Sequence, residues 1–123
     1  MTQSRRRTVL VVDDDEDLCA LVAAVLVEEG YAVETAANGQ EALTAVERNL
    51  PDLIVLDMKM PVMDGREFAR KFHSLYDHLS PIVILTASVD GRVRADEVEA
   101  TDWLAKPFDL GALVESVERN LRP

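Results

Sequence analysis

Five side chains that could hold a metal ion and a phosphoryl group each follow a run of apolar residues. They are Asp13 and Asp14, Asp57, Thr86 and Lys106. Carboxylate oxygens suit a hard divalent ion such as Mg²⁺, which keeps several waters and completes its shell with phosphate oxygens. A lysine would add a fixed positive charge, and a threonine hydroxyl would add a donor. This combination is what phosphoryl transfer to a carboxylate requires.

Three carboxylates cannot share one site without a cost. Unit charges about 4 Å apart repel by roughly 4 kcal/mol at an effective dielectric near 20. Either one of them is protonated, with a raised pKa, or a cation binds among them. With a cation and Lys106 in place, Asp57 would be the nucleophile and would form an acyl phosphate. The positive charges would stabilise the transition state by position and electrostatics rather than by acid–base chemistry.

Each of these residues has an ordinary explanation when it is taken alone. An aspartate after a strand most often caps the next helix, and Asp14 or Asp15 could do only that. Glu16 and Asp17 are typical of a first helical turn, where the helix dipole favours acidic side chains. Helix caps do not explain why reactive residues follow four different strands, so the joint pattern favours a functional site.

Apolar runs alternate along the chain with segments of helical period. Continuous apolar runs at residues 9–12, 53–56 and 82–85 predict strands that are buried on both faces. The alternating segment 31–35 predicts a more exposed strand, and residues 103–105 predict a fifth strand. Helical spacing predicts a helix after each strand, around residues 18–26, 42–50, 68–75, 93–98 and 110–121. The pattern of the fourth helix is weak and polar.

Strands that alternate with helices imply right-handed crossovers and a parallel sheet covered on both faces. Five such units in 123 residues predict an α/β fold, a flavodoxin-like three-layer sandwich with strand order 2-1-3-4-5 and five helices. A (β/α)₈ barrel needs about twice this length. We expect one domain over residues 1–123, with a basic extension at 1–7 and a core at about 8–121. Strands one and three are then neighbours, so the three aspartates should converge.

Composition excludes several classes of protein. The net charge of −10, from 13 basic and 23 acidic residues, predicts no direct binding to nucleic acid. Cys19 is the single cysteine, and its place on the apolar side of a helix predicts a packed thiol. The basic start is followed by only four apolar residues, too few for a signal-peptide core or a membrane span. We therefore expect a cytoplasmic protein without membrane contact.

From about Thr8 to Leu121 the chain resembles the response-regulator receiver domains of two-component signalling. Four segments carry the resemblance: VVDDD at residues 11–15, LDMKMPVMDG at 56–65, LTAS at 85–88 and KPF at 106–108. The order and spacing of all four, rather than any one, make it specific.

The resemblance implies a Mg²⁺-dependent (or Mn²⁺-dependent) phosphoacceptor switch. Asp57 would take a phosphoryl group from a sensor histidine kinase or a phosphotransfer protein. The surface of helix four, strand five and helix five would then change and signal to a downstream effector protein or domain. The resemblance leaves a homodimer open. It implies no enzyme that turns over a separate substrate, only assistance to the domain's own phosphotransfer and dephosphorylation.

The resemblance also implies a set of metal ligands. Asp14 would bind the ion directly and Asp13 partly through water. Asp57 and the backbone carbonyl of Lys59 would be further ligands. Lys59 and Ser88 also flank the phosphorylation site at positions that tune dephosphorylation in the family.

Other positions would respond to the phosphoryl group or shape the site. Thr86 would move to bond the phosphoryl group, and Lys106 would pair with it. Trp103 would change rotamer as Thr86 moves, although a tryptophan in a small domain can also be simply part of the core. The Lys106–Pro107 bond is expected to be cis, and Gly65 would serve the turn that opens the third helix.

The chain departs from the family pattern before the fifth strand. The stretch from Thr86 to Lys106 is shorter than is common, and Ala100-Thr101-Asp102 replaces the usual glycine-containing turn. We therefore expect a fourth helix that is short, shifted or partly unwound. Many receivers use this surface for partners, so the partner mode of the family does not transfer.

Three other functions compete with this interpretation. A pseudo-receiver would keep the fold as an interaction module without phosphorylation, but the complete site argues against it. A haloacid-dehalogenase-type phosphohydrolase needs a second aspartate two residues after the nucleophile, where this chain has Lys59. A nucleotide-binding module needs a glycine-rich phosphate loop after the first strand, which is missing here. His73 and His78 have two explanations: one is a phosphohistidine role, and the other is that they are ordinary surface histidines.

Overall fold

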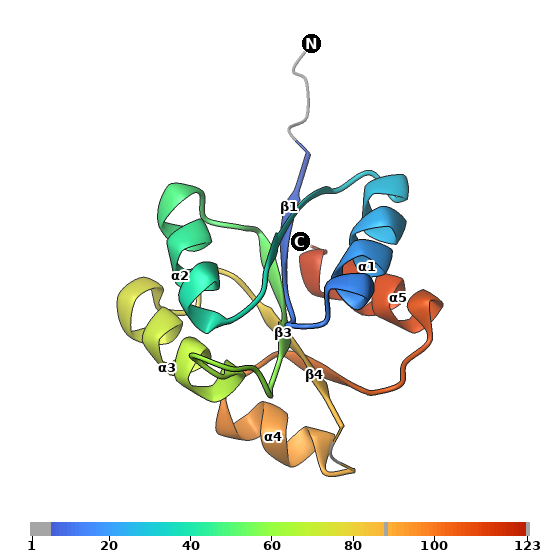
Figure 1. The fold of residues 1–123 in the computed structure, drawn as a ribbon. Helices are drawn as coiled ribbons and strands as arrows, with labels where there is room; N and C mark the ends of the chain where they lie inside the picture. Colours follow the sequence, from blue (N-terminus) through green and yellow to red (C-terminus); the bar gives the residue numbers. More distant parts are fainter. Residues whose placement is uncertain (1–5, 88, 123) are drawn as a thin grey trace.

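The computed structural model describes residues 6–87 and 89–122, so the start of the basic extension and Ser88 lie outside the described residues. The strands are β1 (Thr8–Val12), β2 (Ala32–Ala36), β3 (Leu53–Asp57), β4 (Ile82–Thr86) and β5 (Asp102–Ala105). All neighbouring strands are parallel, in the order β2-β1-β3-β4-β5 (Figure 1). The predicted strand order is confirmed.

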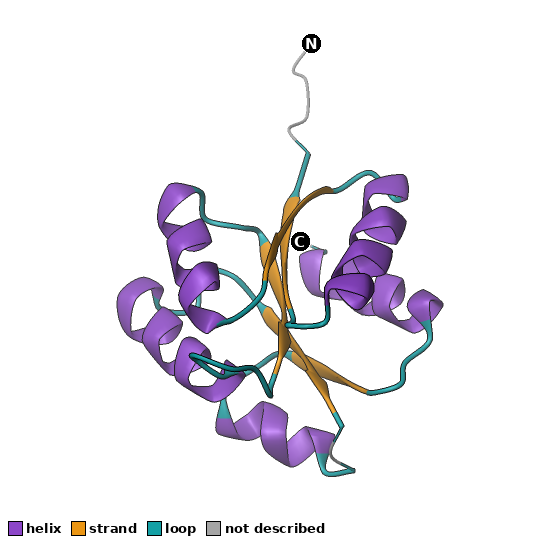
Figure 2. Ribbon diagram, in the orientation of Figure 1, coloured by secondary structure: helices purple, strands orange, loops and turns teal. Residues whose placement is uncertain are grey.

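Five helices connect the strands and close the fold: α1 (Glu16–Glu28), α2 (Gly39–Arg48), α3 (Gly65–Tyr76), α4 (Gly91–Glu97) and α5 (Leu110–Leu121). Figure 2 shows them as layers on the two sides of the sheet. One apolar cluster joins the sheet to α2, α3 and α4, and the other joins it to α1 and α5. None of the helices in the described part of the chain is long and apolar enough to cross a membrane.

The central strands are buried because helices cover both of their faces. Every residue of β1, β3 and β4 is buried, which explains their continuous apolar runs. Successive side chains point to opposite faces of a sheet, so Leu10 and Val12 pack into one cluster while Val9 and Val11 pack into the other. Cys19 of α1 belongs to the second cluster and is buried, as its position predicts.

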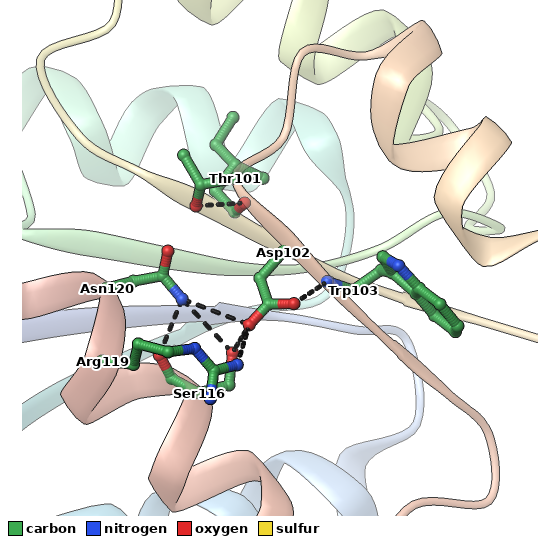
Figure 3. A network of polar contacts seen from close by, with 7 residues as sticks. Thr101, Asp102, Trp103, Ser116, Arg119 and Asn120 are labelled. Carbon is green, nitrogen blue, oxygen red and sulfur yellow. Dashed lines mark hydrogen bonds and ion pairs between the residues drawn. The ribbon is translucent and has the colours of Figure 1, made fainter.

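The edge strand β5 is fixed by polar contacts with α5 rather than by a deep core (Figure 3). One carboxylate oxygen of Asp102 accepts from Ser116 Oγ at 2.7 Å and from the side chains of Arg119 and Asn120. Its other oxygen accepts from the backbone N–H of Trp103 at 2.8 Å. Although burial alone would raise the pKa of Asp102, these donors lower it on balance. The charged network therefore sets the position of the backbone next to Trp103.

Helix α4 has seven residues, which confirms the expectation of a short fourth helix. Trp103 covers its first turn so closely that a Cβ on Gly91 would lie 2.1 Å from Cε3 of the indole. The indole is not a core side chain, since Trp103 is 37% exposed. Glycine at position 91 is therefore required by the close approach of β5 and α4.

Candidate functional site

The reactive residues meet at the carboxyl edge of the sheet, where β1 and β3 are neighbours and their helices leave in opposite directions. Asp13 directly follows β1, Asp57 and Thr86 end β3 and β4, and Lys106 directly follows β5. The strand registers set these ends side by side. They line an open cavity of about 690 Å³, which also includes Asp14. The predicted convergence is therefore present.

The three aspartates form a cluster of oxygen donors. One carboxylate oxygen from each of Asp13, Asp14 and Asp57 lies within 4.8 Å of the others. Asp13 and Asp57 are buried, whereas Asp14 is exposed at the mouth of the cavity. A donor set of carboxylates with access to water fits Mg²⁺ or Mn²⁺ better than a metal that prefers nitrogen or sulfur ligands.

Lys106 reaches into the same cluster from β5. Its Nζ lies 2.8 Å from Asp13 Oδ2 and 3.3 Å from Asp57 Oδ1. The Lys106–Pro107 peptide bond is cis, as the resemblance implied. The backbone N–H of Asp15 holds the other oxygen of Asp13 at 3.0 Å. Asp13 is therefore oriented from both sides, with one oxygen toward the ammonium group.

The charges at the site are balanced unevenly. Burial and the neighbouring carboxylate of Asp13 raise the pKa of Asp57, although Lys106 and the backbone N–H of Lys59 partly offset this. Burial alone would lower the pKa of Lys106, but Asp13 and Asp57 raise it on balance, so the ammonium stays charged. The site therefore has an excess of negative charge that a divalent cation would relieve.

The thiol of Cys19 lies behind the site and takes no part in its charge. Its Sγ donates to the backbone carbonyl of Asp13 at 3.2 Å. Burial, together with the negative charge of Asp13, raises the pKa of Cys19 to about 11. The thiol is therefore protonated at neutral pH, which excludes it as a nucleophile there.

Gly65 lets the start of α3 approach the reactive aspartate. Its backbone N–H donates to the carbonyl of Met58 at 3.1 Å. A Cβ at this position would lie 2.5 Å from the carbonyl oxygen of Asp57. Only glycine fits so close to the backbone of β3, and it is the first residue of α3, consistent with the implied turn. Lys59 also lines the cavity, and the role of its carbonyl stays a prediction.

Sequence reasoning missed two arginines that line the cavity, Arg66 at the start of α3 and Arg94 on α4. Glu97 Oε1 accepts from Arg66 Nη2 at 2.8 Å and faces Arg94 Nη1 at 3.2 Å. Arg94 Nε is buried and has no hydrogen-bond partner among the residues that the structure describes. These residues lie on helices, so a search of strand ends could not find them. The position of Arg66 directly after Gly65 could have indicated that it lies near the cavity.

Thr86 and Trp103 lie on the same face of the sheet. Trp103 pairs in register with Ile84, two residues before Thr86. Residues at this spacing point to one face, and here Ile84 packs into the cluster that includes α4 residues. The structure therefore brings Thr86 into the cavity and places Trp103 beside it along the sheet, against α4, rather than among the reactive groups.

Comparisons with known proteins agree with this fold and site. The sequence model of the response regulator receiver domain matches residues 9–118. The chain is 45% identical over 116 residues to the transcriptional regulatory protein PrrA of Mycobacterium tuberculosis, covering 93% of this chain and 49% of that protein. It is 38% identical over 116 residues to the regulatory protein VanRB of Enterococcus faecalis, covering 93% and 52%. The chain thus spans about half the length of these curated relatives.

A solved structure of the chemotaxis response regulator CheY4 of Vibrio cholerae is similar throughout. The TM-score is 0.87 at 37% sequence identity, covering 95% of this chain and 100% of that one. The chain therefore belongs to the response regulator receiver domains of two-component systems.

The raised pKa of Asp57 predicts that Asp57→Asn stabilises the metal-free domain at neutral pH. A carboxyl whose pKa is raised on folding makes the native state bind more protons than the unfolded state, so stability falls as pH rises from the ordinary value toward the raised one. The asparagine variant should not show this loss. Urea unfolding in EDTA from pH 4 to 7 measures both proteins.

Glu47→Gln, an exposed change on α2, is the control and should shift stability by no more than about 0.5 kcal/mol. A less stable Asp57→Asn protein at pH 7 would mean that the contact between Asp57 and Lys106 outweighs the burial and repulsion.

Proposed function

We propose that this chain is a Mg²⁺-dependent phosphoacceptor switch in which Asp57 takes a phosphoryl group from a phosphohistidine of a sensor kinase or a phosphotransfer protein. The observation that carries the proposal is the packing of three carboxylates within 4.8 Å beside the ammonium group of Lys106. This arrangement leaves the cluster short of positive charge, and a divalent ion together with phosphoryl oxygens would restore the balance.

Each residue has a defined part in the proposed reaction. A carboxylate oxygen of Asp57 attacks phosphorus, the phosphorus–nitrogen bond of the phosphohistidine breaks, and the electron pair stays with the imidazole. Lys106 and the hydroxyl of Thr86 donate to the phosphoryl oxygens. Asp13, Asp14, Asp57 and the carbonyl of Lys59 would hold the ion. When bound, Mg²⁺ supplies positive charge that stabilises the phosphoryl oxygens in the transition state.

The proposed product is a modified domain rather than a released compound. Lys59 stands where a phosphohydrolase would need an acid–base aspartate, which favours a persistent acyl phosphate over rapid turnover. We therefore propose a cytoplasmic receiver domain that is not a turnover enzyme and that signals to an effector through α4, β5 and α5. A phosphorylation-independent interaction module is the alternative.

Incubation with acetyl phosphate and Mg²⁺ should add one phosphoryl group to the native chain, measured by intact-mass spectrometry. Asp57→Asn should add none, because the amide lacks a nucleophilic carboxylate oxygen. EDTA should abolish the gain in the native chain. Circular dichroism of the asparagine variant checks that the fold is kept.

Equal phosphoryl gain in Asp57→Asn would show that the site is assigned to the wrong residue. No gain in the native chain with Mg²⁺ would favour the interaction module, and the search would turn to partners of the unmodified domain.

The two arginines at the mouth of the cavity extend this proposal. Arg66 and Arg94 are bound to Glu97 and line the same cavity as Asp57. Phosphoryl oxygens are strong acceptors for guanidinium groups. The Nε–H of Arg94, which has no hydrogen-bond partner among the described residues, could donate to one of them. An incoming phosphoryl donor would therefore compete with Glu97 for Arg94. Because Glu97 is on α4, this exchange would carry the charge change to the signalling surface.

Arg94→Gln should slow phosphoryl uptake from acetyl phosphate by about tenfold, since a hydrogen bond to a charged group contributes about 1.5–3 kcal/mol. Glu97→Gln should raise the rate of phosphoryl uptake, because it weakens the ion pairs with both arginines. Initial rates with saturating Mg²⁺ measure both effects.

Arg92→Gln is the matched control, because Arg92 lies on α4 and is exposed but does not line the cavity. Its rate should equal that of the native chain. A similar slowing in all three variants would indicate damage to α4 rather than loss of an arginine donor.

Trp103 is the proposed reporter of the switched state. It lies on the face of Thr86 and against Gly91 of α4, so a movement of Thr86 toward a phosphoryl group would change the space that the indole occupies. We propose a population shift between two packings of α4 and β5 rather than a new fold.

Phosphorylation should change the emission of Trp103, which is the single tryptophan of the chain. The change should be absent in Asp57→Asn and reduced in Thr86→Ala, which can still be phosphorylated but has no hydroxyl. Steady-state fluorescence with acetyl phosphate and Mg²⁺ measures it. An unchanged spectrum in a chain shown by mass to be phosphorylated would exclude Trp103 as part of the switch.

A further inference from the structure

A second cluster of metal-binding side chains lies at the opposite edge of the sheet from Asp57. His73 is in the last turn of α3, His78 follows in the connection to β4, and Glu99 follows α4. Because α3 begins at the carboxyl edge of the sheet and returns along it, its end lies at the amino edge. This cluster therefore shares no residue with the site around Asp57.

The donors of this cluster already face one another. One nitrogen of each histidine and one carboxylate oxygen of Glu99 lie within 4.8 Å of each other. His78 Nε2 is 2.9 Å from Glu99 Oε1. The rings of His73 and His78 are stacked, with centroids 4.2 Å apart and planes 24° apart. His78 is 54% exposed and Glu99 66% exposed, so both can turn toward a common point without disturbing the core.

Asp77 orients His78 from the other side. Its Oδ1 lies 3.1 Å from His78 Nδ1, so the imidazole is held between two carboxylates. A histidine that binds a metal through one nitrogen usually donates its other N–H to a carboxylate, which fixes the ring. The contact between His78 and Asp77 has this arrangement, with Nε2 directed at Glu99 as the metal-binding nitrogen.

The backbone places both carboxylates in unusual positions. Asp77 and Glu99 have φ values of 58° and 56°, and they are two of the three non-glycine residues with positive φ in the described part of the chain. Glycine is the usual residue for this conformation just after a helix. Asp77 directly follows α3, and Glu99 comes two residues after α4. The helix dipole disfavours negative side chains at these ends and favours a cation.

We propose that His73, His78 and Glu99 form a binding site for Zn²⁺, with Asp77 as the carboxylate that orients His78. Two imidazole nitrogens and one carboxylate oxygen are a common ligand set for zinc, with water in the fourth position. The nitrogen donors separate this site from the oxygen-only cluster around Asp57, which suits Mg²⁺. A bound zinc ion would join the end of α3 to the segment that follows α4.

The test uses the fact that His73 and His78 are the only histidines of the chain. ZnCl₂ is titrated into the full chain with saturating Mg²⁺ present, and the ring nitrogens of both histidines are followed by NMR. One equivalent of zinc should shift the signals of both rings together. The melting temperature should rise with zinc concentration, because a ligand bound only to the native state stabilises it.

Single substitutions separate the proposed ligands from other acids. His73→Gln and Glu99→Gln should each weaken zinc binding at least tenfold. Asp77→Asn should weaken it about tenfold, the lower end of the effect of outer carboxylates on metal affinity. Glu47→Gln on α2 should leave the affinity unchanged. Asp57→Asn should also leave it unchanged, which makes the result independent of the proposed phosphorylation.

Two results would overturn the proposal. One is that neither ring signal moves up to millimolar zinc. The other is that His78 still binds with native affinity in both His73→Gln and Glu99→Gln, which would mean attachment to a single surface histidine. Melting temperatures of the metal-free variants check that each variant is folded before it is compared.

Discussion

The side chains of Asp13 and Asp57 are almost completely removed from solvent beside each other, and the rest of the site is arranged around this repulsion. Their side chains are 1% and 8% exposed, and Lys106 is the cation that touches both. Burial and the neighbouring carboxylate of Asp13 raise the pKa of Asp57, and the single ammonium group of Lys106 offsets this only in part. The metal-free domain thus keeps an electrostatic strain that cation binding would relieve.

The parallel sheet imposes this arrangement. Because β1 and β3 are covered by helices on both faces, their carboxyl ends are the first points where polar side chains can follow the strand. The registers of β3, β4 and β5 then bring Asp57, Thr86 and Lys106 to one edge. The start of α3 approaches the backbone of β3 beside the site, and this approach depends on the missing side chain of Gly65. Fold and charge cluster are therefore two results of one pattern of apolar runs.

The link between buried strands and apolar runs explains which parts of the fold and the site could be predicted from the sequence. Buried strands appear as continuous apolar runs, so the strand order and the residues at strand ends followed from local patterns. Arg66 and Arg94 escaped prediction because they lie on helices rather than at strand ends, and their place at the cavity depends on how α3 and α4 pack against the sheet. The cluster of His73, His78 and Glu99 depends on two positive φ angles at non-glycine residues, and residue identity gave no sign of them.

Helix α4 connects these separate features. Its own buried residues are only Gly91 and Ala95, so a broad apolar surface does not hold it. Instead, Trp103 packs on its first turn, Glu97 binds Arg66 of α3, and Glu99 contacts His78 just after its end. An element held by few apolar contacts and several polar ones has a low local stability and responds to small changes in charge. A phosphoryl group on Asp57 that bonds to Arg94 would therefore first change the position of α4.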